Sequence, residues 1–200
     1  KFNKMKGAAM KIRRATLKYL KELYAKKSAD ALLNSATKLQ VECPNSIIAR
    51  VYVSRGLALG KRFAEAADIL ESVVLPFPKL KRVYLEYIRY LKAAGREAQW
   101  EIQSFRFLEY HSSSKLCYEL GGYFFRKREW RRALSCYQRL REAMGRGGEQ
   151  GSLTVLDGII GMVYFHLEDF NSAIEYLSDS SLDSTCYYRA RIYRDRGALG

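Results

Sequence analysis

Apolar side chains recur along this chain at the three- and four-residue intervals of an amphipathic helix. Strict alternation of apolar and polar residues, the pattern of a half-buried strand, is absent, and only three prolines interrupt the sequence. The pattern therefore predicts an all-α protein, with helices expected, for example, over residues 97–110 and 183–196.

Two segments repeat one pattern of small and large apolar residues, forty residues apart. The first segment contains Leu120, Gly121, Phe124, Trp130, Ala133 and Tyr137. The second contains, at the same intervals, Ile160, Gly161, Tyr164, Phe170, Ala173 and Leu177. Self-similarity at a fixed period is typical of repeat proteins, which usually work by binding along an extended surface.

The small residues of the pattern have a packing reason. A glycine inside a helix costs about 1 kcal/mol relative to alanine, so Gly121 and Gly161 indicate close approach of two helices. Ala133 and Ala173 are the small residues expected to meet them on the next helix. The pattern resembles the tetratricopeptide repeat, a pair of helices with the motif L-G-x-x-Y followed by A-x-x-x-F. The closing proline of that repeat is missing from both copies, and the extra length falls in the Gly-rich segment 145–151.

Weaker copies flank the two strong ones. Their characteristic residues are Tyr52, Gly56, Phe63, Ala66, Leu70, Tyr84, Tyr87, Leu91, Cys186, Ala190 and Tyr193. The last copy has only a first helix, whose apolar side is expected to hold Tyr188, Ile192 and Tyr193. We therefore predict a right-handed α-solenoid of about five tetratricopeptide-like hairpins, the last one incomplete. Residues 1–9 are predicted to be a basic lead, and residues 10–200 a single superhelical domain from a longer array.

Two narrower resemblances depend on particular residues. Tyr84, Tyr87 and Trp100 resemble the half-a-TPR repeats of RNA-processing scaffolds. Residues 187–193 resemble the amino-terminal arrays of the TPR subunits of the anaphase-promoting complex, which also lack the closing proline. The first resemblance implies contact with RNA, and the second implies a subunit of a cell-cycle assembly.

The net charge of +14 is concentrated at the amino-terminal end, where residues 1–40 contain eleven basic and two acidic side chains. The basic face expected on the first helix consists of Lys11, Arg13, Arg14, Lys18 and Lys21, and its apolar face of Ile12, Ala15, Tyr19, Leu20 and Leu23. One interpretation is the polar exterior of a capping helix. The other is a landing surface for acidic protein, nucleic acid or an anionic membrane.

Residues that could perform chemistry do not converge. Cys117 and Cys186 are each expected to be buried four residues before the small residue of a helix, and no cysteine spacing predicts a disulfide or a zinc site. His111 and His166 have no partners at metal-ligand intervals. The segment 145–151 lacks the G-K-[ST] ending of a phosphate-binding loop. We expect no catalytic residue, metal or cofactor, no membrane span, and a reducing compartment, the cytoplasm or nucleus.

The resemblance to tetratricopeptide repeats also implies a binding groove, because first helices in that family line a groove that holds extended peptides. The implied groove residues are Lys115, Tyr118, Phe125, Arg126, Met162, Phe165, Arg191 and Arg194, together with Arg82 and Arg89 of an earlier hairpin. Trp130, although surrounded by cations, is expected to lie in the core. This basic and aromatic groove suits a partner with acidic and apolar side chains.

The sequence thus predicts a non-catalytic scaffold that binds another subunit of a multisubunit assembly. Two alternatives remain: an RNA-processing scaffold whose basic amino-terminal face contacts RNA, and a homodimer in which one groove accepts a helix of the other chain.

Overall fold

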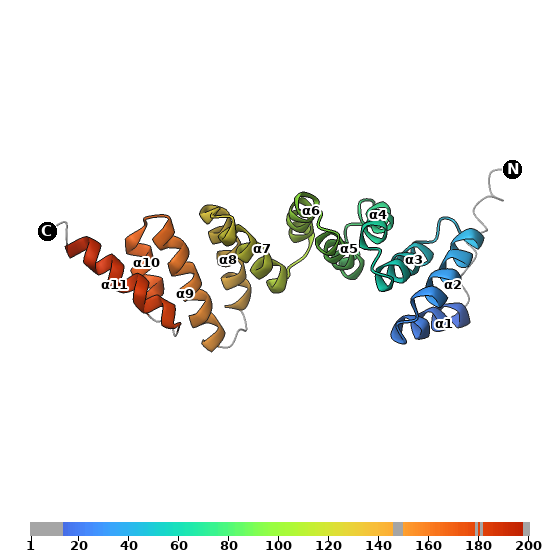
Figure 1. Ribbon diagram of the computed structural model, residues 1–200, viewed down its shortest axis with the longest axis horizontal. Coiled ribbons are helices and arrows are strands. Elements are labelled where there is room, and N and C mark those ends of the chain that lie inside the picture. Colours follow the sequence, from blue (N-terminus) through green and yellow to red (C-terminus); the bar gives the residue numbers. More distant parts are fainter. Residues whose placement is uncertain (1–13, 146–149, 179, 181, 198–200) are drawn as a thin grey trace. The chain divides into compact units, whose positions relative to one another are not determined.

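The computed structural model describes residues 14–145, 150–178, 180 and 182–197, and these residues form only helices and turns (Figure 1). The predicted all-α fold is confirmed. The contacts within the chain divide it into two compact units, which we call the amino-terminal unit (residues 1–111) and the carboxy-terminal unit (residues 112–200). The predicted boundary between a lead at 1–9 and a domain at 10–200 stays a prediction, since the lead lies outside the described residues.

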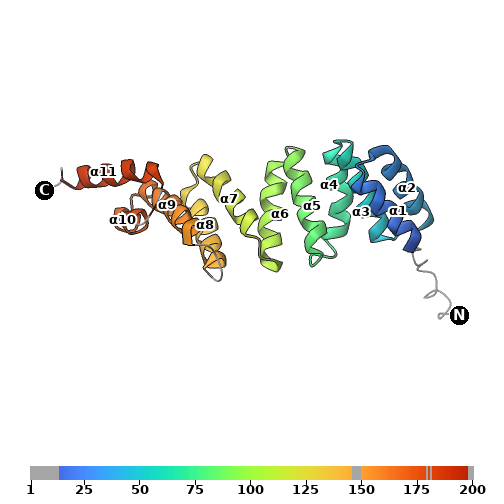
Figure 2. The ribbon, with the colours of Figure 1, turned by 90° about the horizontal axis from the view of Figure 1, so that it is seen from below.

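The amino-terminal unit is a stack of three helical hairpins. Its helices are α1 (Arg14–Ala25), α2 (Ala29–Glu42), α3 (Ile47–Leu59), α4 (Phe63–Val74), α5 (Lys81–Ala93) and α6 (Glu97–Tyr110). Within each hairpin the two helices pack against each other, and α2 also packs on α3 and α4 on α5 (Figure 2). Each hairpin therefore buries its apolar side against the next.

The carboxy-terminal unit repeats this arrangement with α7 (Ser114–Arg126), α8 (Trp130–Met144), α9 (Gln150–His166) and α10 (Phe170–Ser178). A last helix, α11 (Asp183–Gly197), packs on α9 and α10. No second helix follows α11 among the described residues, which agrees with the predicted incomplete last repeat.

The turn inside every hairpin has the same backbone geometry. One residue in each turn has a positive φ between 54° and 71°, and these residues are Lys27, Lys61, Gly95, Arg128 and Glu168. In the α3–α4 turn, for example, the amide of Lys61 donates to the carbonyl of Ala58 at 3.0 Å and the amide of Arg62 donates to that of Leu57 at 2.9 Å. The other four turns have the same two hydrogen bonds. They close the C-terminus of the first helix in the manner of a Schellman motif, and the second helix begins two residues after the positive φ.

This shared turn gives the true alignment of the repeats. Lys27, Lys61 and Gly95 follow one another at 34-residue intervals, Arg128 comes 33 residues later, and Glu168 comes 40 residues after that. The forty-residue interval read from the sequence is thus the exception. The extra length was expected in the Gly-rich segment 145–151, but it lies mainly in the helices: α8 and α9 have 15 and 17 residues, whereas α4 and α5 have 12 and 13.

The core of each hairpin is built from equivalent positions. The fourth and eighth residues of every second helix are buried: Leu32, Ala36, Ala66, Leu70, Trp100, Ser104, Ala133, Tyr137, Ala173 and Leu177. On the first helices, the position seven residues before the positive φ is buried too, and it holds Leu20, Ser54, Ile88, Gly121 and Gly161. Together, these positions fill the seam between the two helices of a hairpin.

The glycines in this seam make room for large partners. A Cβ on Gly121 would come within 2.6 Å of the Tyr137 ring, and one on Gly161 within 2.7 Å of Leu177. The expected close approach is present, but the atoms nearest Gly121 belong to Tyr137 rather than to Ala133. The tyrosine ring is the reason that no side chain fits at residue 121.

The predicted register of α11 is only partly right. Ile192 is buried, as expected, but Cys186 and Ala190 are exposed and Thr185 is buried instead. Tyr193, expected on the apolar side, is 55% exposed. With no second helix to pack against among the described residues, α11 takes its buried side from its contacts with α9 and α10 instead of from the repeat pattern. The parallel expectation for Cys117 is confirmed, because that thiol is buried.

The apolar face predicted for α1 is only partly right. Leu20 is fully buried, but Ala15 is exposed and Tyr19 is 51% exposed. The predicted basic residues Arg14, Lys18 and Lys21 are exposed, and Lys11 and Arg13 lie outside the described residues. Lys18 contacts Glu22 at 4.0 Å in an exposed pair, which contributes little to stability.

The shared turn predicts opposite effects for two substitutions. Gly95→Ala should lower the free energy of unfolding by about 1 kcal/mol, because the strain comes from the backbone: nothing lies within 4 Å of a Cβ at this position, where φ is 71°. Lys61→Gly should raise stability, because the φ of 61° there favours glycine.

Urea denaturation of each variant measures both effects. Gly60→Ala is the matched control, because Gly60 has a φ of −78° and accepts a Cβ at ordinary contact distance. If Gly95→Ala and Gly60→Ala have the same effect, the turn is not strained in the way described.

Candidate functional site

Helices of the amino-terminal unit line an open pocket of about 290 Å³. Its walls come from α1, α3, α4 and α5, and the lining residues are Tyr24, Arg55, Ala58, Leu59, Phe63, Arg89, Tyr90 and Ala93. We call it the Arg89 pocket. Among the predicted groove residues of this unit, Arg89 lines the pocket, whereas Arg82 is exposed on α5 and does not.

The two arginines of the Arg89 pocket differ in how they are satisfied. Arg55 donates two hydrogen bonds to Glu86, from Nε to Oε2 at 2.8 Å and from Nη2 to Oε1 at 2.7 Å. Burial disfavours its charge, but the hydrogen bonds and negative charge of Glu86 raise the pKa of Arg55. Its guanidinium also lies over the rings of Tyr24 and Tyr52, at 5.1 and 5.0 Å from the centroids.

Arg89, in contrast, is exposed and has no ion-pair partner in the part of the chain that the structure describes. The charge of Arg55 is therefore neutralised inside the protein, while the charge of Arg89 remains available at the surface.

A second pocket, of about 310 Å³, lies between α7, α8 and α9. Its lining is almost wholly apolar and consists of Tyr118, Leu140, Met144, Ser152, Val155, Leu156 and Ile159. Tyr118, one of the predicted groove residues, is 54% exposed and contacts the Tyr137 ring edge-on at 6.2 Å. This Tyr118 pocket could accept an apolar side chain.

The C-terminal ends of α7 and α9 bring together a cluster of rings. Trp130 and His166 stack with their centroids 4.2 Å apart and their planes 8° apart. Phe125, Phe165 and Tyr188 surround His166, with centroids at 6.1, 5.6 and 5.9 Å. Trp130 is only half-buried, so it belongs to this aromatic cluster rather than to the fully buried core that we expected.

The electrostatics of the cluster favour a neutral imidazole. Burial lowers the pKa of His166, and the positive charges of Arg128 and Arg191 lower it further. Arg191 also lies over the Phe165 ring, 5.6 Å from its centroid. The aromatic cluster is therefore uncharged at neutral pH and has cations at its edge.

The structure brings some of the predicted groove residues together and leaves others apart. Phe125, Phe165 and Arg191 meet in the aromatic cluster, and Met162 is half-buried on α9 beside it. The remaining members in this unit are exposed, namely Lys115, Arg126 and Arg194, the last of which contacts Asp195 at 3.2 Å. A groove that continues through both units stays a prediction.

Sequence reasoning missed the best-connected residue of the site, Arg55. It occupies the same position of its helix as Arg89, 34 residues earlier, and Lys21 occupies that position on α1. The 34-residue interval was the signal that could have revealed all three, but the stronger forty-residue repeat concealed it. The pairing with Glu86 had no signal in the sequence.

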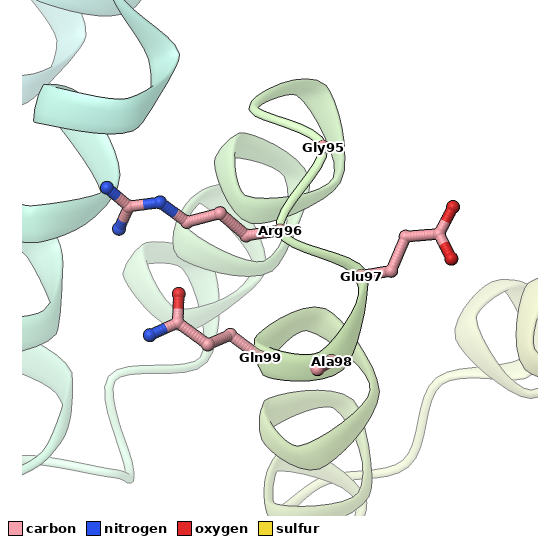
Figure 3. Close-up of a pocket in the computed structure, with 5 residues that line it drawn as sticks. All are labelled: Gly95, Arg96, Glu97, Ala98 and Gln99. Carbon is pink, nitrogen blue, oxygen red and sulfur yellow. The ribbon is translucent and has the colours of Figure 1, made fainter.

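A surface depression at the turn between α5 and α6 has fewer groups that could bind a ligand. Figure 3 shows this depression, lined only by Gly95–Gln99 of one turn, where Arg96 and Gln99 extend to one side and Glu97 to the other. Arg96 is already held by two hydrogen bonds to Asp68 of α4. The depression therefore has no converging polar groups.

The thiols and acidic side chains offer no catalytic site in the residues that could be described. Burial raises the pKa of Cys136 to about 11 and also raises that of Cys117, so both thiols stay protonated. No group of His, Cys, Asp and Glu there could hold a metal ion. His111, at the end of α6, contacts the carbonyl of Pro78 at 2.9 Å, which is a structural role. None of the described helices is long and apolar enough to cross a membrane.

Comparison with known proteins identifies the fold. No protein-family model and no curated protein matches the sequence. Among solved structures, MamA is similar with a TM-score of 0.64 at 12% identity, over 90% of this chain and 93% of MamA. The TPR-like repeats of a putative kinesin light chain from Podosopora anserina match with a TM-score of 0.57 at 13% identity, over 89% of this chain and 95% of theirs. Human IFIT1, solved as a dimer with PPP-AAAA, matches with a TM-score of 0.55 at 17% identity, over 80% of this chain and 45% of its own.

The chain therefore has the tetratricopeptide-like fold that the repeated glycines and aromatics predicted. Identities this low establish the fold alone, and none of these structures supports the finer likeness to anaphase-promoting-complex subunits.

The lowered pKa of His166 predicts a pH dependence of stability. The unfolded chain binds the proton first, near the ordinary histidine pKa of about 6.5. The contribution of neutral His166 to the stability of the fold is therefore fully present above that pH. It is lost as the pH falls through the pKa of His166 in the folded protein. His166→Phe retains a ring against Trp130 but cannot be protonated.

Thermal unfolding followed by circular dichroism between pH 7.5 and pH 5 tests this. The variant should lose less stability over that range than the parent. Equal losses in both proteins would show that His166 is not held in its neutral form.

Proposed function

We propose that this chain is a non-catalytic scaffold that binds segments of partner proteins on its first-helix faces. The observation that carries the proposal is the aromatic cluster of the carboxy-terminal unit, where half-buried Phe125 and Phe165 both contact His166 and the cation Arg191 lies over the Phe165 ring. Aromatic and arginine side chains supply most of the binding energy in protein interfaces. The Tyr118 pocket adds an apolar site on the same hairpins.

The partner is proposed to be acidic with some apolar side chains. The chain has a net charge of +14, and the cations of the first helices include Lys115, Arg126 and Arg191. Opposite charge on the partner would accelerate its association and select against basic competitors. The basic residues of α1 are, in this proposal, the solvated exterior of a terminal helix.

The setting is proposed to be a multisubunit assembly in the cytoplasm or nucleus. A subunit of the anaphase-promoting-complex type is one such setting, and its support is the likeness of residues 187–193. The absence of converging catalytic groups among the described residues supports a scaffold rather than an enzyme.

Two alternatives have their own observations. The RNA alternative is favoured by three exposed cations around the α7–α8 turn, Arg126, Arg128 and Arg131, and by the likeness to IFIT1, which was solved with PPP-AAAA. The homodimer alternative is favoured by two exposed tyrosines on α11: Tyr187 is 61% exposed and Tyr193 is 55% exposed.

The proposal predicts which substitutions weaken the affinity for a partner. Changing Phe125 and Arg126 together to Ala should weaken the main partner by about 2 kcal/mol or more, because it removes an aromatic anchor and a cation. Changing Arg14, Lys18 and Lys21 together to Gln should have little effect. The affinity of a partner identified by co-purification is measured by isothermal titration calorimetry, with circular dichroism to check that both variants are folded.

The proposal would be contradicted if the changes of Phe125 and Arg126 left the affinity for the partner unchanged while the changes on α1 weakened it. That result would place the binding surface on the basic face of the amino-terminal unit and would favour RNA or another polyanion.

A further inference from the structure

We propose that the Arg89 pocket of the amino-terminal unit binds an aromatic side chain that has a carboxylate next to it, in an acidic segment of a partner protein. This inference rests on the proposed function in taking the partner to be a protein. It concerns a different surface from the aromatic cluster around His166, and it can be tested separately.

The size and walls of the pocket fit one aromatic ring. A volume of about 290 Å³ lies at the lower end of the range for ligand sites and is too small for a cofactor. Three of its lining side chains are aromatic, namely Tyr24, Phe63 and Tyr90. The Phe63 and Tyr90 rings lie 6.3 Å apart, tilted by 35° to each other, and form one aromatic wall of the pocket.

The base of the pocket is polar but already satisfied. Arg55 is held by both carboxylate oxygens of Glu86, and Glu86 is only 7% exposed. A second carboxylate entering this deep would have to compete with Glu86 for the same guanidinium and would lose its hydration. The part of the ligand that enters is therefore uncharged, and a ring can pack there against the aromatic side chains Tyr24, Phe63 and Tyr90.

The mouth of the pocket carries an unmatched positive charge. Arg89 lines it, is exposed, and has no ion-pair partner in the part of the chain that the structure describes. No Asp or Glu is among the lining residues. A carboxylate beside the inserted ring would pair with Arg89, and the planar guanidinium favours such a bidentate contact.

Nucleic acid fits these observations less well. A base could enter the pocket, but a strand brings one phosphate per nucleotide, and single-strand sites follow the backbone with a series of cations. Only Arg89 among the lining residues has an uncompensated charge. The buried carboxylate of Glu86 beneath the pocket would also disfavour a phosphate.

The test uses the whole chain and a defined probe, a fluorescein-labelled peptide that alternates Asp and Phe between Gly-Ser ends. Fluorescence anisotropy measures its affinity. Two matched peptides replace either every Asp by Asn or every Phe by Ala, and a labelled oligoadenylate of similar length reports on RNA. The acidic aromatic peptide should bind at least tenfold more tightly than any of the three other probes.

Substitutions in the chain show which surface binds the peptide. Arg89→Ala and Tyr24→Ala should each weaken the acidic aromatic peptide about tenfold or more. Arg82→Ala is the matched control, because it removes an exposed arginine from the same helix without touching the pocket. The paired change of Phe125 and Arg126 to Ala reports separately on the aromatic cluster: a loss of affinity there, with none in Arg89→Ala, would overturn the pocket and leave the proposed function standing. A failure of the pocket is thereby distinguished from a failure of the aromatic cluster.

Several outcomes would overturn the inference. They are undetectable binding of the peptide, equal binding of its Asn counterpart, and equal effects of Arg89→Ala and Arg82→Ala. Tighter binding of oligoadenylate that is lost in Arg89→Ala would assign the pocket to nucleic acid instead.

Discussion

The backbone turn inside each hairpin is the constraint on which the rest of this structure depends. A residue with positive φ and two backbone hydrogen bonds ends the first helix and starts the second after two residues, in all five hairpins described. Because the turn is the same, each residue of a first helix has an equivalent in the next hairpin. Arg55 and Arg89 come to line one pocket because they occupy the same position in neighbouring repeats. Only one of the five turns uses glycine, so the hydrogen bonds and helix packing must offset the strain at the other four.

The packing between the helices of a hairpin follows from this fixed register. Two side chains together fill a space of nearly constant volume between the helices. One lies on the first helix, seven residues before the positive φ, and the other is the eighth residue of the second helix. Where the second helix supplies Tyr137 or Leu177, the first helix supplies glycine. Where the second helix supplies the small residue Ala36, the first helix supplies Leu20, and both are fully buried. The volume is conserved although the residues are exchanged, which explains why hairpins of similar structure have such different sequences.

The same reasoning shows what could be predicted from the sequence. The helical fold, the two strong repeats and the bounds of α6 follow from periodicity and from residues such as Gly121 and Gly161, whose cost needs a packing explanation. The 34-residue spacing of the first three turns was hidden, because Lys27 and Lys61 do not have the glycine signature of a positive φ. The exposure of Cys186 and Ala190 on α11 was not predicted, because a helix at the end of an array takes its buried side from the helices it meets. The Arg55–Glu86 pair and the Trp130–His166 stack join residues far apart in sequence, and no local pattern encodes them.

The central claim is that the first helices bind partners while the second helices hold the array together. Site-specific photo-crosslinking in cells tests it most directly. Benzoylphenylalanine is placed at Tyr118 or Ala93 on first helices, and at Ile102 or Ser135 on second helices, where Ile102 is 63% exposed and apolar. The account predicts that the first-helix positions crosslink to a common partner and that the second-helix positions do not. Equal crosslinking from Ile102 and Ser135, or crosslinking from them alone, would contradict it.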